Sequence, residues 1–454
     1  LGFNHLHTLT VSGGNAKTNY RVTADYRYAR GIDLSSDRRE YGARAGVNHT
    51  TKSGLFTFTA NLTPRIIKRN KMTGSYSNVL VINPTAPIYD ESTANGYYHF
   101  PAGSNYSNVV ESMTQVTNDT EIKLLEWNTG VQMNLLPLFT PKHPDYSLTT
   151  KATVSGYEVD KFGGYFAPST ISWHQNDKIK GDASRSFDKS SQTNFDWVTN
   201  FSAQFGGHRL RAMAGYSCFY VVNSGMSASN QDFTSDGLGY NNLGAGEWAS
   251  KEGQICLGSY KNDSKLISFY GRLNYDWKER YLLSVSLRHE GSSKFGQNHK
   301  WGNFPAMSLA WNIKGEQFLN NIQAISTLKL RAGFGITGTE PGSAYISLNS
   351  LNLGGYGYYN GQWTNLLRPG GNPNPDLRWE KKEELNIGLD FGFLNDRVSG
   401  SIDFYNRETK DLIGGYQVPV PPYYSAWITA NAGSIRNTGL EVSLNVVPVQ
   451  NKNF

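Results

Sequence analysis

Hydrophobic and polar residues alternate strictly over residues 385–393 of the chain. One face of this stretch is apolar, and it consists of Leu385, Ile387, Leu389, Phe391 and Phe393. The same alternation restarts at Val398 after a short turn at 394–397. A repeat of two residues predicts two β-strands of one hairpin, each with an apolar face and a polar face.

Both predicted strands are longer than the usual five or six residues of a strand in a soluble protein. Their length is near the 9–11 residues that a tilted strand needs to cross a lipid bilayer. The polar face carries Asp390 and Asp403, which suits a water-filled lumen. The hairpin therefore predicts an outer-membrane β-barrel whose apolar face contacts lipid.

The alternation recurs along the chain and predicts about 15 strands joined by short and long connections in turn. Short connections of this kind lie at the periplasmic end of a barrel, and those expected here are Gly13-Gly14, Ser53-Gly54, Gly206-Gly207, Lys278-Glu279 and Asn395-Asp396. Long outer loops are expected at 69–119, 161–192, 223–263, 338–377 and 412–431, and a short helix at 316–325.

The fold class expected is thus all-β, an antiparallel transmembrane β-barrel with short periplasmic turns and long extracellular loops. Glycine and aromatic residues are abundant, and the mean hydropathy of −0.49 is compatible with a barrel because only alternate strand residues meet lipid. An odd number of antiparallel strands cannot close, so residues 1–454 are expected to form part of a larger barrel.

Charge and motifs exclude several function classes. The net charge of +6 is spread along the chain without a basic block, so no nucleic-acid partner is expected. Cys218 and Cys256 are too few for a disulfide framework; the two could pair in an oxidising periplasm or at a cell surface, but the favoured interpretation is that they are unrelated residues. No complete hydrolase, metalloprotease, phosphate-loop or EF-hand motif occurs, so no enzyme activity, catalytic residue, cofactor or metal is expected. A hydrolase that uses His289 or His299 with the nearby Ser292 and Ser293 remains a weaker alternative.

Several short motifs, in order along the chain, resemble those of one family. They are Gly13-Gly14-Asn15 with Lys17 to Tyr20, Gly31-Ile32 with Arg38, Trp301 to Pro305, Leu328 to Arg331 leading to Gly335 to Gly338, Asn374 to Glu380, and Asn437 to Glu441. In these motifs the chain resembles the SusC/RagA-type TonB-dependent transporters of Bacteroidetes over nearly its whole length.

The resemblance implies a 22-stranded outer-membrane barrel that contains an N-terminal plug. Such a transporter imports oligosaccharides or peptides beneath a SusD-type lid lipoprotein, with energy from TonB. Residues 1–454 are then expected to be a partial barrel, with the plug, the TonB-contacting region and further C-terminal strands outside this sequence. A passive porin or an adhesion barrel is the alternative, and glycan and peptide remain open as ligands.

Two sets of residues are candidates for ligand contact. Aromatic residues in the predicted outer loops are candidates for stacking on sugars or peptide side chains, although they can equally pack between loops or against the lid: Tyr97, Tyr98, Tyr165, Trp173, Tyr358, Tyr359, Trp363 and Tyr424. Charged residues on the predicted inner face either contact a plug or ligand or simply keep the wall hydrated: Arg21, Arg27, Arg211, Arg272, Arg288, Asp390 and Asp403.

Overall fold

The computed structural model describes residues 2–139, 145–250, 256–319 and 321–449. Within them, one antiparallel sheet contains 15 strands, which are neighbours in chain order apart from two hairpins left out of the sheet. The first strands of this sheet are β1 (Phe3–Gly14), β2 (Thr18–Arg30), β3 (Asp37–Thr50), β4 (Phe56–Asn70), β5 (Thr117–Asn134), β6 (Tyr146–Ala167), β7 (Asp182–Phe205) and β8 (His208–Gln231). The remainder are β9 (Leu257–Trp277), β10 (Tyr281–Ser292), β11 (Trp301–Asn312), β12 (Ile325–Thr339), β15 (Glu380–Phe393), β16 (Val398–Lys410) and β19 (Ser434–Val446).

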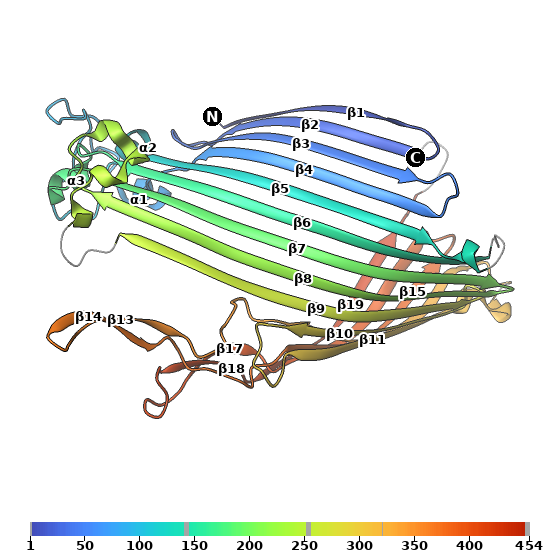
Figure 1. The fold of residues 1–454 in the computed structure, drawn as a ribbon. Coiled ribbons are helices and arrows are strands. Elements are labelled where there is room, and N and C mark those ends of the chain that lie inside the picture. The colour runs from blue at the N-terminus through green and yellow to red at the C-terminus, as the bar shows by residue number, and fades with distance from the viewer. Residues whose placement is uncertain (1, 140–144, 251–255, 320, 450–454) are drawn as a thin grey trace.

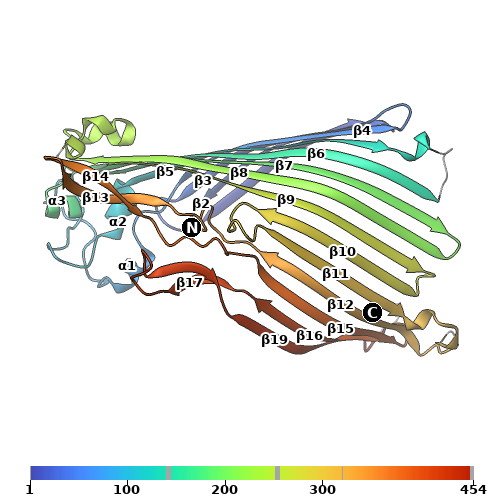
Figure 2. The ribbon, with the colours of Figure 1, turned by 60° about the horizontal axis from the view of Figure 1, so that its bottom comes forward.

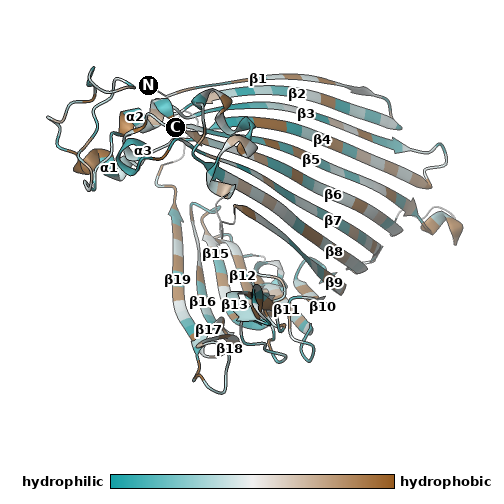
Figure 3. Ribbon diagram, turned by 60° about the vertical axis from the view of Figure 1, so that its left-hand side comes forward, coloured by the Kyte–Doolittle hydropathy of each residue, from teal (hydrophilic) through white to brown (hydrophobic). Residues whose placement is uncertain are grey.

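The sheet curves strongly, so that two walls face each other. Figure 3 shows β1 to β9 as one wall and β10 to β19 as the other. β1 and β19 are the two edges of the sheet. The described residues therefore form a trough-shaped barrel wall, as the alternating pattern predicts.

The register places apolar and polar residues on opposite faces of this wall. Leu330, Leu389 and Ile402 lie opposite one another on three neighbouring strands. One residue further along, Arg331, Gly388 and Asp403 form the next row, and directly opposed residues share a face of the sheet. The alternation read from the sequence is therefore present in three dimensions.

The apolar face has no second sheet packed against it. Leu287, Phe269 and Leu309, on the central strands β9 to β11, are 51%, 51% and 49% exposed. Such an exposed apolar band is the lipid-contacting surface of a transmembrane barrel. Within the described residues, no helix is long and apolar enough to cross a membrane.

Aromatic rings mark one border of this band, beside the short turns. Tyr281 stacks on Trp277 with ring centroids 5.4 Å apart and on Trp311 at 6.4 Å. Stacked Tyr and Trp rings are typical of the membrane–water interface. The short-turn rim therefore lies at one surface of the bilayer.

Short and long connections lie at opposite ends of the strands (Figures 1 and 2). The five predicted short turns all join consecutive strands at the same end. The long connections at the other end contain the helices and hairpins that the sequence analysis did not resolve: α1 (Tyr76–Val81), α2 (Val109–Gln115), α3 (Ser172–Asp177), β13 (Leu351–Tyr359) paired with β14 (Gln362–Pro369), and β17 (Ile413–Gln417) paired with β18 (Trp427–Asn431).

Two of the predicted loops are partly strand. Most of 161–192 belongs to β6 and β7, whereas in 223–263 only the two ends, 223–231 and 257–263, belong to β8 and β9. These four strands have 22, 24, 24 and 21 residues and extend beyond the length that a bilayer requires. Above the membrane both faces meet water or loops, so the alternation that reveals a strand is lost.

The helix expected at 316–325 was also wrong. The chain instead forms 3₁₀ turns at Ile313–Gly315 and Gln317–Leu319. Other short 3₁₀ turns lie at Leu136–Leu138, Asp236–Asn241, Leu243–Ala245 and Trp248–Ser250. A connection this short closes with i to i+3 hydrogen bonds and does not reach the length of a stable α-helix.

A charge on the apolar face tests the orientation of the wall. We expect Leu389→Arg, in the middle of the lipid-facing stretch of β15, to lower the free energy of unfolding in bilayers by about 2–4 kcal/mol. Asn386→Arg, on the inner face of the same strand, is the matched control and should change it by less than about 1 kcal/mol. Denaturant unfolding in lipid vesicles measures both, and equal losses would contradict the assignment of the two faces.

Candidate functional site

The inner face of the wall is a polar surface built from alternate strand residues. Arg272 lines a hollow of about 400 Å³ with serines of β10 and β11 and with Lys382, Glu384 and Asn386 of β15. Arg211 lines a neighbouring hollow with Asn274 and Asp276. Arg211 and Arg272 therefore line two adjoining hollows of one polar surface.

Arg331 is the centre of an ion cluster on this surface. Its guanidinium donates to Asp390 at 2.7 and 2.8 Å and to Asp403 at 3.0 Å. The predicted inner-face residues Asp390 and Asp403 thus meet each other through an arginine that the sequence analysis did not single out. A Cβ at Gly388 would overlap the Asp403 carboxylate, so glycine leaves the space in which the cluster lies.

A second cluster, in which one arginine again contacts two carboxylates of neighbouring strands, lies on β2 to β4. Arg65 contacts Asp25 at 3.1 Å and the buried Glu40 at 2.9 Å. The predicted lumen residue Arg27 lies 3.8 Å from Glu40. Gly42 again leaves the space, since a Cβ there would lie 2.5 Å from Asp25. Both clusters join three adjacent strands across the inner face.

The last two predicted lumen residues differ in their surroundings. Arg288 donates to Glu290 at 2.6 Å and to Ser268 at 2.8 Å, and its guanidinium lies 5.6 Å from the ring of Tyr270. Arg21 lies opposite Ser12 and Gly46 on the same inner face of β1 to β3. The seven candidates are therefore spread over the wall and do not converge on one binding pocket.

The loops above the wall are held together by a fully buried glutamate. Glu111 of α2 accepts hydrogen bonds from Asn95 at 2.6 Å and from the backbone and hydroxyl of Ser172 at 3.0 and 2.7 Å. His99 lies 2.9 Å from the same carboxylate. The β4–β5 and β6–β7 loops therefore form one connected body at the long-connection end of β5 to β7.

Four of the candidate aromatic residues belong to this loop body. Trp173 of α3 and Tyr165 pack against the buried Val116, Ala167 and Ile171. Tyr165 was wrongly placed in a loop, because it lies in β6. The Tyr97 hydroxyl accepts a hydrogen bond from Thr114 at 2.9 Å, and Tyr98 packs edge-on against Phe100 at 5.2 Å.

The other four candidates are free of such packing. Tyr358, Tyr359 and Trp363 of the β13–β14 hairpin are 66%, 76% and 70% exposed, and Tyr424 is 67% exposed. Tyr358 and Trp363 contact each other, with ring centroids 5.6 Å apart. Figure 1 shows this hairpin apart from α2 and α3, so the eight aromatic candidates form separate groups.

The motif Asn374 to Glu380 has a structural role in the same region. Leu377 and Trp379 are buried with Phe295 and Phe304 in a small apolar cluster, above the last paired residues of β11 and β12. The Trp379 indole donates to the carbonyl of Lys300 at 3.1 Å. We call this cluster with its polar contacts the rim clamp, since it joins the β10–β11, β12–β15 and β16–β19 connections.

An ion pair completes the rim clamp. Arg378 donates to Asp411 at 2.7 Å, and Asn431 donates to the Arg378 carbonyl at 2.7 Å. The hydrogen bond from Arg378 lowers the pKa of the Asp411 carboxyl below its usual value. A lowered pKa in the folded protein adds stability above the ordinary pKa of aspartate, and that stability is lost only as the pH falls through the lowered value.

The hydrolase alternative finds no support in the geometry. His289 stacks on Trp301 on the apolar face, whereas the Ser292 hydroxyl donates to Glu340 at 2.7 Å. His299 lies 3.7 Å from Asp376. Cys218 and Cys256 are both free. In the part of the chain that is described, no group of three His, Cys, Asp or Glu side chains is placed to hold a metal.

Comparison with known proteins identifies the family of this wall. The family model described as TonB dependent receptor-like, beta-barrel matches residues 83–447. The chain belongs to this family. It is a SusC/RagA-type barrel of the outer membrane, and the resemblance inferred from its motifs is confirmed.

The relatives of this TonB-dependent receptor barrel are themselves receptors or transporters. The chain is 29% identical to the TonB-dependent receptor SusC of Bacteroides thetaiotaomicron, over 99% of this chain and 45% of that protein. It is 27% identical to the TonB-dependent receptor P3 of Formosa agariphila, over 98% and 44%. The chain thus spans less than half the length of the curated relatives it matches.

Solved structures support the same fold. The RagAB peptide transporter superposes with a TM-score of 0.80 at 22% identity, covering 99% of this chain and 49% of that chain. The siderophore receptor PirA of Acinetobacter baumannii gives a TM-score of 0.56 at 14% identity, over 98% and 57%. The candidate ligand residues named above stay predictions, because neither likeness assigns them.

The rim clamp can be tested at a glycine. A Cβ at Gly296 would overlap the carbonyl oxygen of Pro375, so we expect Gly296→Ala to separate the two loops and to destabilise them by about 1–3 kcal/mol. Gly342→Ala is the matched control, since a Cβ there meets nothing within 4 Å. Limited proteolysis of the 340–379 connection should be faster only in Gly296→Ala, and identical digestion of both variants would refute the clamp.

Proposed function

We propose that the complete protein imports oligomeric nutrients, oligosaccharides or peptides, across the outer membrane with energy from TonB. Residues 1–454 supply barrel wall and extracellular loops, while the plug and the TonB-contacting region belong to other parts of the protein. The family membership supports this proposal. The observation that carries it is the inner face, which is charged and hydroxyl-rich along the whole wall.

The chemistry of the inner face suits passage of a polar oligomer. Charged side chains of the inner face form ion pairs with one another, as Arg331 does with Asp390 and Asp403. Serines such as Ser284, Ser286 and Ser308 offer hydrogen bonds that form and break readily. A wall of this kind can form hydrogen bonds with a ligand without binding it tightly.

The ligand class rests on the loop aromatics. Tyrosine and tryptophan rings stack on sugar rings and also grip peptide side chains, so the eight candidates support both classes equally. The structural relative RagAB is named a peptide transporter, and SusC is a sequence relative at 29% identity. We therefore propose an oligomer of either class, selected by these loops.

A test of energy coupling separates this function from a passive porin. We expect cells with the complete protein to accumulate labelled oligomer, identified from what co-purifies with it, and to lose accumulation at least tenfold when TonB is deleted. Uptake of a small control sugar through an unrelated porin should not change. Oligomer uptake that persists without TonB would support the passive porin and refute active import.

We also propose that a SusD-type lid lipoprotein contacts the β13–β14 hairpin. The hairpin exposes Leu351, Leu353, Tyr359 and Leu367 at 62%, 64%, 76% and 64%, together with Trp363. Aromatic and apolar side chains that gather on a projecting element are typical of protein interfaces. The projecting position of the hairpin in Figure 2 leaves it accessible to a partner above the barrel.

Removal of the central aromatic side chains tests this contact. We expect Tyr359→Ala with Trp363→Ala to weaken lipoprotein binding by about 2–4 kcal/mol, which is the size of an interface hot spot. Phe318→Ala, at the short-turn rim, removes an aromatic side chain of similar exposure, 66%, and is the control that should have no effect. Co-purification at varied salt measures both, and unchanged recovery with the double variant would exclude the hairpin as the lid contact.

A further inference from the structure

The outward face of β4 and β5 changes from apolar to charged within a few residues. Opposed pairs along these strands run from Leu62 and Trp127 through Ile66 and Lys123 to Lys68 and Glu121. The last fully apolar pair is Pro64 and Leu125. At a rise of about 3.3 Å per residue and a strand tilt of about 40°, the rows of Lys123, Glu121 and Asp119 lie roughly 5–15 Å above it. This height corresponds to the headgroup layer of the outer leaflet.

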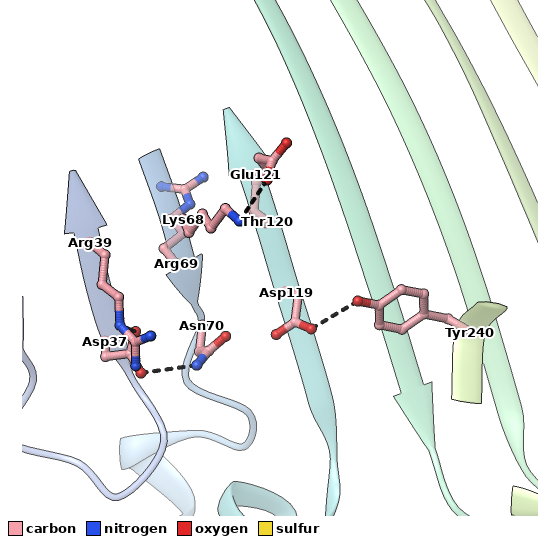
Figure 4. Close-up of a pocket in the computed structure, with 9 residues that line it drawn as sticks. All are labelled: Asp37, Arg39, Lys68, Arg69, Asn70, Asp119, Thr120, Glu121 and Tyr240. Atoms are coloured by element: carbon pink, nitrogen blue, oxygen red, sulfur yellow. Dashed lines mark hydrogen bonds and ion pairs between the residues drawn. The ribbon is translucent and has the colours of Figure 1, made fainter. Parts of the chain in front are cut away.

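Two adjoining hollows lie on the outward face at this height. Their volumes are about 330 and 290 Å³, and they share Asp119, Glu121 and Tyr240. Tyr240 comes from the β8–β9 connection and reaches over the wall to donate to Asp119 at 2.9 Å (Figure 4). We call the two hollows together the outer groove.

The outer groove has an excess of positive charge. Its outward side chains include three acidic ones, Asp37, Asp119 and Glu121, and four basic ones, Arg39, Lys68, Lys123 and Arg185, which leaves a net charge of +1. Each acidic group is already engaged: Asp119 by Tyr240, Asp37 by Asn70 at 3.0 Å, and Glu121 by Lys68 at 3.4 Å and Lys123 at 3.2 Å.

The guanidinium groups at the two ends retain donor capacity. Arg39 lies 4.0 Å from Asp37 and its side chain is 52% exposed. Arg185 is exposed and lies 5.9 Å from the ring of Tyr240. Lys68 and Lys123, the lysines of the groove, are 61% and 53% exposed, and their ammonium groups contact only Glu121 among the carboxylates. The groove therefore offers several donors to an anionic ligand.

We propose that the outer groove binds the phosphorylated headgroup of an outer-leaflet glycolipid. Planar guanidinium groups match phosphate oxygens, while the amide of Asn70 and the partly used carboxylates suit sugar hydroxyls. Directly below the groove, Ile66 and Tyr41 are 40% and 48% exposed on the apolar face, where acyl chains of the same lipid would lie. A ligand in the lumen cannot reach this face, which points away from the trough.

The test uses the complete protein in nanodiscs and three probes. These are bisphosphorylated lipid A, the same lipid with its phosphates removed, and inorganic pyrophosphate. We expect Arg39→Gln with Arg185→Gln to weaken binding of bisphosphorylated lipid A by roughly 10- to 100-fold, about tenfold for each charged hydrogen-bonding group. Binding of the dephosphorylated lipid should be weak and equal in both proteins.

Two variants serve as controls. Arg39→Lys with Arg185→Lys keeps the charge and should retain most of the binding, which a merely misfolded protein would not. Lys278→Gln removes a charge at the opposite rim, beside Trp277, and should bind lipid A as the unaltered protein does. Heat-dependent mobility of each variant in gels verifies that its barrel is folded.

Two results would overturn the proposal. Equal affinity of the Gln double variant and the unaltered protein for bisphosphorylated lipid A would show that the arginines of the groove do not bind the lipid phosphates. Displacement of the lipid by pyrophosphate at similar concentrations would identify free phosphate, and not a membrane lipid, as the ligand. Neither result bears on nutrient import, because the groove lies outside the lumen.

Discussion

This structure depends on one constraint, which is that every backbone N–H and C=O group within the membrane needs a hydrogen-bond partner in the protein. In the hydrocarbon of a bilayer no water is present to satisfy N–H and C=O groups, so each strand must pair along its whole length with a neighbour. Pairing meets this demand for the strands between β1 and β19, while these two each keep one edge that no described strand covers. It also fixes the side chains, since alternate residues then face lipid and lumen. The apolar outer band, the ion clusters inside and the turns at one rim all follow from it.

This constraint explains which parts of the fold could be predicted from the sequence. The hairpin of β15 and β16 was predicted correctly because each strand crosses the bilayer and alternates throughout. The upper halves of β7 and β8 were taken for loops, since residues such as Ser190, Ser191 and Asn223 face neither lipid nor an apolar core. Hydrogen bonds to the neighbouring strand hold those residues in a strand, and the residues show no alternation of apolar and polar side chains. A prediction that relies only on hydrophobic alternation therefore misses these parts of the strands.

The site was predicted less completely than the fold, and the reason lies in chain distance. Asp390 and Asp403 lie on the polar face of the hairpin, but their shared partner Arg331 is 59 residues before Asp390. Glu111 meets Ser172 across 61 residues. Nothing in a local pattern indicates such contacts. The motif Asn374 to Glu380 marked the family, yet its Leu377 and Trp379 are buried, so the motif stabilises the rim and its apolar side chains are not offered to a ligand.

The ion clusters of the inner face and the outer groove differ in how tightly their charges are paired. Inside, Arg331 and Arg65 are only 33% and 28% exposed, and each holds two carboxylates at 3.1 Å or less. Removing one member of such a group leaves a charge without its partner, so these groups belong to the construction of the wall. Outside, Lys68, Lys123 and Arg39 are 61%, 53% and 52% exposed, with single contacts of 3.2 to 4.0 Å. Exposed pairs this loose contribute little to stability, so the charges of the outer groove are available for binding.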